Sequence, residues 1–115
     1  MNNVAEQALV GVSAGSVSRW IPVDSFTADF AVTYVVFHAS GPGQVSGNIE
    51  GTLDDVLALG FTSARAFVIA TANPSTGLAI GAVTNVPINA IRYKATVVSA
   101  SSNIVFQVLQ AGPVV

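Results

Sequence analysis

Few side chains in this sequence are suited to chemistry, and the first to consider is the sole histidine, His38. A histidine acts as a general base when a second group orients it and a nucleophile or water lies within reach. His38 ends an apolar stretch, directly before Ala39 and Ser40-Gly41-Pro42-Gly43, and the chain has no cysteine nucleophile. This position favours a residue at the end of a strand over a catalytic base.

Carboxylates offer a second possibility, because Glu50, Asp54 and Asp55 make up half of the six acidic residues. Paired carboxylates can cleave glycosides or bind calcium. On an extended strand Glu50 and Asp54 would point the same way but lie about 13 Å apart, too far to share a proton or one metal ion. Asp54 and Asp55 instead resemble a strand end and turn, where aspartate accepts hydrogen bonds from backbone N–H groups.

Two glycine motifs are also without the context that chemistry needs. Gly11-Val12-Ser13-Ala14-Gly15 matches G-x-S-x-G, but a nucleophile elbow requires a helix after the serine, and no helix start follows. Gly41-Pro42-Gly43 lacks the lysine and hydroxyl residue of a phosphate loop. We therefore expect no enzyme activity, no catalytic residue, no cofactor and no metal site.

The only tryptophan and one arginine are better read as contact residues. Trp20 precedes Ile21-Pro22, and an exposed tryptophan would serve as an anchor for a protein or a sugar, whereas a buried one would pack at an edge. Arg92 lies on the polar face of the alternating strand Ile91-Arg92-Tyr93-Lys94-Ala95-Thr96-Val97. We expect it to pair with an acid across the sheet, either Glu50 or Asp54.

The composition limits the partners. The 115 residues are 51% hydrophobic and only 9% charged, against about one-quarter charged in an average domain. Four basic residues exclude a basic nucleic-acid face, no apolar run reaches the ~20 residues of a membrane span, and the start lacks the basic region of a signal peptide. So few charges hydrate an ordinary surface poorly, which indicates that partners bury part of it.

Runs of β-branched and aromatic residues, bounded by Gly, Pro, Asn and Ser, predict about eight short strands. Seven are expected at 16–23, 30–39, 44–53, 64–71, 78–83, 88–99 and 103–110, with 4–12 as a weaker eighth that could instead be an arm or a short helix. Turns at 40–43, 73–77 and 99–103 are expected to close hairpins. Residues 54–60 could form one helical turn with Asp54 as its N-cap.

This spacing predicts an all-β fold, an antiparallel β-sandwich, with the jelly roll and an Ig-like Greek key both open. Residues 1–15 are expected to form an N-terminal arm or edge strand, and 16–115 a single sandwich domain. The segment Phe30-Ala31-Val32-Thr33-Tyr34-Val35-Val36-Phe37 is apolar on both faces. It predicts a central strand covered on both sides, by a second sheet and a neighbouring subunit or by loops.

Four segments in order resemble those of small structural proteins of tailed bacteriophages. They are Ile21-Pro22-Val23-Asp24, Asn48-Ile49-Glu50-Gly51-Thr52-Leu53-Asp54-Asp55, Pro87-Ile88-Asn89-Ala90-Ile91-Arg92 and Phe106-Gln107-Val108-Leu109-Gln110-Ala111-Gly112. The resemblance implies a β-sandwich virion protein, foremost a capsid decoration (cement) protein that bridges capsid subunits. Alternatives are a tail or head-fibre component and a carbohydrate- or receptor-binding module.

The resemblance also implies partners and a location. The partners would be the major capsid protein and copies of the chain itself, with a trimer favoured, and neither nucleic acid nor a membrane. The protein would be made in the host cytoplasm without a signal peptide and lie on the capsid surface. As interface residues we expect the loop or edge aromatics Trp20, Phe26 and Phe61, together with Val4 and Leu9 of an N-terminal arm that clasps a neighbour.

Overall fold

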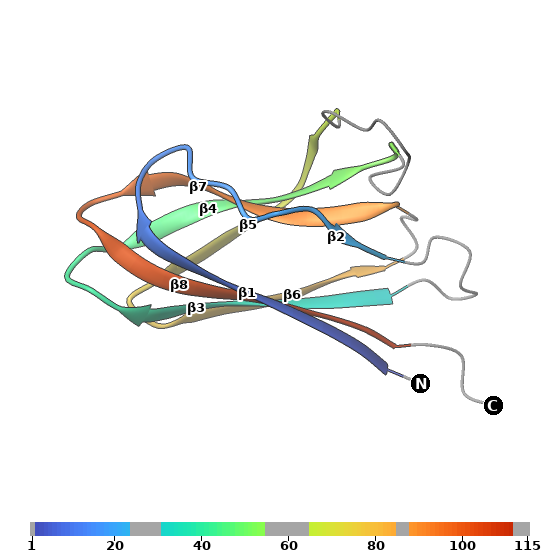
Figure 1. The fold of residues 1–115 in the computed structure, drawn as a ribbon, viewed down its shortest axis with the longest axis horizontal. Coiled ribbons are helices and arrows are strands. Elements are labelled where there is room, and N and C mark those ends of the chain that lie inside the picture. Colours follow the sequence, from blue (N-terminus) through green and yellow to red (C-terminus); the bar gives the residue numbers. More distant parts are fainter. Residues whose placement is uncertain (1, 24–30, 55–64, 85–87, 112–115) are drawn as a thin grey trace.

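The chain folds into two four-stranded antiparallel sheets that pack as a sandwich (Figure 1). The computed structural model describes residues 2–23, 31–54, 65–84 and 88–111. In spatial order, the strands of sheet A are β1 (Asn2–Val12), β8 (Ser102–Ala111), β3 (Ala31–Ser40) and β6 (Leu78–Thr84). Those of sheet B are β2 (Ile21–Pro22), β7 (Ala90–Val98), β4 (Val45–Thr52) and β5 (Phe67–Ser75). The predicted all-β sandwich of eight strands is confirmed.

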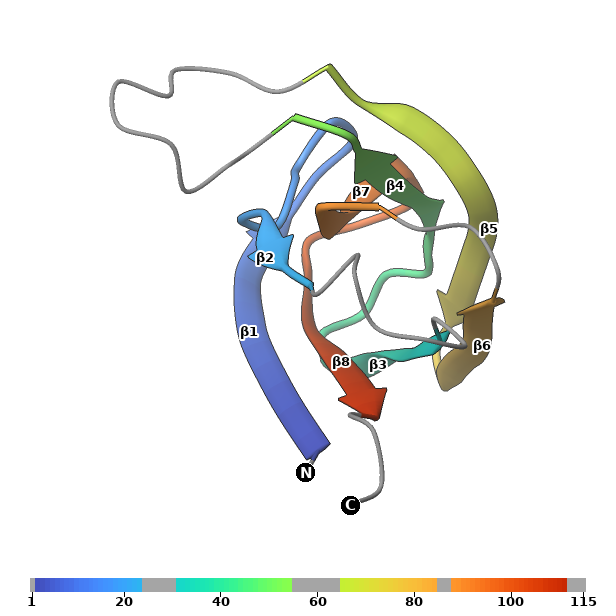
Figure 2. The ribbon, with the colours of Figure 1, turned by 90° about the vertical axis from the view of Figure 1, so that its right-hand side faces the viewer.

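Each strand pairs with the strand at the mirrored place in the chain. β1 pairs with β8, β2 with β7, β3 with β6 and β4 with β5, so the chain runs as one long two-stranded ribbon. Two further pairings, of β3 with β8 and of β4 with β7, join the folded ribbon into the two sheets seen end-on in Figure 2. This order is that of a jelly roll, which decides between the two topologies that the sequence left open.

The three predicted hairpins were wrong. The turns at 40–43, 73–77 and 99–103 connect β3 to β4, β5 to β6 and β7 to β8, and in each case the two strands belong to different sheets. Glycine, proline and asparagine mark where a strand ends, but the same residues suit a turn that leaves the sheet. Gly43 packs directly on the backbone of Ala100, so the first and third turns lie against each other at one end of the sandwich.

The N-terminal part follows the prediction in one place and differs in another. The strand expected at 4–12 is confirmed as β1, the edge strand of residues 2–12 beside β8, rather than the alternative short helix. The strand expected at 16–23 is reduced to Ile21–Pro22, because residues 15–18 run beside β7 with isolated backbone hydrogen bonds to Tyr93 and Ala95. The helical turn expected at 54–60 lies, beyond Asp54 itself, outside the described residues.

The core is centred on one aromatic pair that joins the two sheets. The rings of Tyr93 in sheet B and Phe106 in sheet A lie 6.1 Å apart, and both side chains are fully buried. The Tyr93 hydroxyl donates a hydrogen bond of 3.1 Å to the carbonyl of Ala72. Burial raises the pKa of Tyr93 to about 12, so the phenol keeps its proton and remains a donor.

Both buried tyrosines lie over a glycine of the neighbouring strand. Tyr34 on β3 is directly opposite Gly81 on β6, and its ring occupies the space that a Cβ at Gly81 would need. Tyr93 fills the same kind of space above Gly47 on β4. Each glycine thus makes room for an aromatic ring that spans two strands, and neither position can accept a larger residue without moving that ring.

Replacing Gly81 by alanine is therefore expected to lower the free energy of unfolding by about 1–3 kcal/mol, because the new methyl group overlaps the Tyr34 ring. Urea denaturation followed by fluorescence or circular dichroism measures the difference. Gly77→Ala is the control, since a Cβ there would meet only the Pro74 carbonyl at 3.8 Å and the expected change is below about 0.5 kcal/mol. Equal effects of the two variants would contradict the packing argument.

Candidate functional site

The residues considered for catalysis are not assembled into a reactive group. His38 is half-buried at the end of β3, and its Nε2 is buried without a hydrogen-bond partner among the residues that the structure describes. Ser13 lies in an exposed turn after β1, where its backbone N–H donates to Ser16 Oγ at 3.1 Å. The histidine thus has no orienting acid within the described chain, and the serine does not lie on a strand-to-helix turn.

Two of the three clustered acids are each held by an arginine. Glu50 Oε1 accepts a hydrogen bond of 2.8 Å from Arg92 Nε. Asp54 accepts one of 2.7 Å from the backbone N–H of Arg65, which together with the Arg65 side chain holds the pKa of Asp54 below its usual range. Asp55 lies outside the described residues. Within the described ranges no cluster of acids and histidines could bind a metal ion, and no helix is long and apolar enough to cross a membrane.

The centre of the outer face of sheet B is an ion pair covered by Trp20. The predicted pairing of Arg92 with Glu50 is confirmed, with only 21% and 9% of the two side chains exposed. Trp20 is half-buried and lies over the guanidinium, whose carbon is 4.4 Å from the ring centroid. Lys94 continues this face along β7, while Val68, opposite Glu50 on β5, is 57% exposed. The face therefore combines charged and apolar side chains.

The outer face of sheet A consists mainly of apolar side chains, with Thr33, Gln107 and Glu6 as its polar members. Its strands are aligned so that outward side chains form rows across β6, β3, β8 and β1. The first row contains Leu78, Phe37, Val105 and Ala8; the second Ile80, Val35, Gln107 and Glu6; and the third Ala82, Thr33 and Leu109. We call these residues the sheet A face. Glu6 is its one charged member, and Gln107 Nε2 donates to the Glu6 carboxylate at 3.2 Å.

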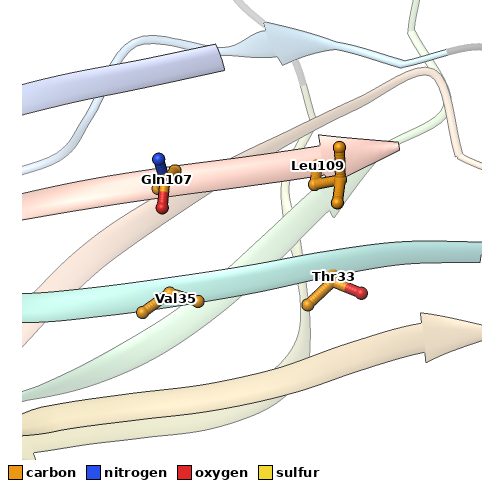
Figure 3. A pocket seen from close by; sticks show the side chains of 4 residues that line it. All are labelled: Thr33, Val35, Gln107 and Leu109. Carbon is orange, nitrogen blue, oxygen red and sulfur yellow. The ribbon is translucent and has the colours of Figure 1, made fainter. Parts of the chain in front are cut away.

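Large aliphatic side chains on this face are open to solvent. Ile80 is 68% exposed, Leu78 55% and Phe37 36%. Between β3 and β8 the face is hollowed into a shallow groove of about 230 Å³. Figure 3 shows the four residues that line it, Thr33 and Val35 on one strand and Gln107 and Leu109 on the other. The groove holds no titratable group, so its chemistry is that of a contact surface.

Residues 30–37 were predicted to form a central strand that is covered on both sides. β3 is indeed a central strand, and Val32, Tyr34 and Val36 are buried against the second sheet. The apolar pattern also predicts that the outward face of β3 is covered. None of the described loops packs on that face.

Two of the five predicted interface residues lie away from the sheet A face. Trp20 packs on Arg92 of sheet B, and Leu9 is half-buried against the core. Val4 occupies the β1 position opposite Leu109, at the edge of the sheet A face, while Phe26 and Phe61 lie outside the described residues. Their roles as contacts stay predictions. The sequence analysis missed Leu78 and Ile80, although the run 78–83 is apolar on both faces, as 30–37 is.

Removing the carboxylate of the covered ion pair should be costly. Glu50→Gln leaves the Arg92 guanidinium largely buried and without a counter-charge, so we expect the free energy of unfolding to fall by about 1–3 kcal/mol. Glu6→Gln, on an exposed edge position, is the matched control and should change it by less than about 0.5 kcal/mol. Denaturant unfolding of both variants provides the comparison, and a neutral Glu50→Gln would show that the pair adds nothing to stability.

The chain was compared with protein families, curated proteins and solved structures, and a match was found among the solved structures. No family model matches the chain, and no curated protein matches it. Among solved structures, a chain from Bacillus endospore appendages, described as a family of disulfide-linked pili, is similar over 98% of this chain and 88% of that chain, with 13% identity and a TM-score of 0.46. The 115 residues of the present chain contain no cysteine.

Proposed function

We propose that this chain is a non-enzymatic structural subunit that packs against other protein subunits through the sheet A face. The observation that carries the proposal is the contrast between the two outer faces. The outer face of sheet B has three charged side chains, Glu50, Arg92 and Lys94, beside an exposed Val68. The sheet A face has exposed Ile80, Leu78 and Phe37, with Glu6 as its one charge. A soluble monomer gains nothing from such a face, whereas a subunit uses it to bury apolar area.

The size of the face supports the same conclusion. Four strands at ~4.8 Å spacing and about 30 Å of mean strand length give a projected area of roughly 570 Å². This projected area, which includes Thr33, Gln107 and Glu6, lies within the ~300–600 Å² found for the largest apolar patch on a typical monomer, and such patches are often functional. Burial of apolar surface contributes roughly 25 cal/mol per Å², so covering this face is a strong driving force for association.

A finer form of the proposal is capsid decoration, and its support is the order of the four phage-like segments in the sequence. In that arrangement the sheet A face would lie on the major capsid protein or on a neighbouring copy, and the outer face of sheet B would point to solvent on the capsid surface. The alternative of a carbohydrate- or receptor-binding module would use an exposed aromatic platform. Trp20, the aromatic considered for that role, is instead half-buried, with one face of its ring packed on Arg92.

Two measurements test the proposal. The purified chain is mixed with empty tailed-phage capsids and the mixture is pelleted, and the mass of the free chain is measured by light scattering. We expect the wild-type chain to pellet with shells or to exceed the monomer mass. Ile80→Lys should abolish this association, because a lysine buried in an apolar contact has no partner.

Val68→Lys is the control, since Val68 is 57% exposed on β5, the edge strand of the other sheet. A chain that stays monomeric at high concentration and ignores every shell would contradict a structural role. Association that is equally sensitive to both lysines would contradict the assignment of the face.

A further inference from the structure

We draw no further inference here: the strongest candidate, the mainly apolar outer face of sheet A with its shallow groove between β3 and β8, carries nothing beyond the proposed function, because nothing in the structure shows what covers it.

Discussion

A two-layer sandwich can bury only one face of each sheet, and this constraint governs the whole molecule. Along every strand alternate side chains enter the shared core, where Tyr93 and Phe106 bring the sheets together. The remaining side chains must face solvent or a partner. With 51% hydrophobic residues, the chain has more apolar side chains than one core takes up, and exposed ones lie on both sheets, among them Ile80 and Leu78 on sheet A and Val68 and Val97 on sheet B.

Charged side chains are distributed unevenly over the two outer faces. On sheet B, Glu50 and Arg92 neutralise each other beneath Trp20, and Lys94 lies beside them on β7. On sheet A, the strands β3 and β6 carry aliphatic residues outward as well as inward. The contact role proposed for the sheet A face rests on this difference in charge.

The strands could be predicted well from the local sequence pattern. Runs of β-branched residues and the turn residues that bound them lie within a few residues of one another along the chain. Alternation on residues 91–97 also placed Arg92 on the polar face and so led to Glu50. Pairing could not be predicted in the same way, since β1 and β8 lie at opposite ends of the chain and no local signal records their register. Without register, no sequence signal distinguishes an outward Ile80 from an inward Val83. The predicted contact residues were therefore chosen as loop or edge aromatics and as apolar residues of the N-terminal arm. The one visible clue to the sheet A face was the segment 30–37, apolar on both sides.

The account depends most on whether the sheet A face is covered in solution. Solvent paramagnetic relaxation of methyl groups in the full chain, recorded by NMR with a soluble gadolinium probe at high protein concentration, measures this directly. The account predicts that the methyl groups of Ile80, Val35 and Leu109 are shielded from the probe, while those of Val68 on the opposite sheet relax as exposed groups. Relaxation of Ile80 as fast as that of Val68 would show that the face is open to water, and it would contradict the account.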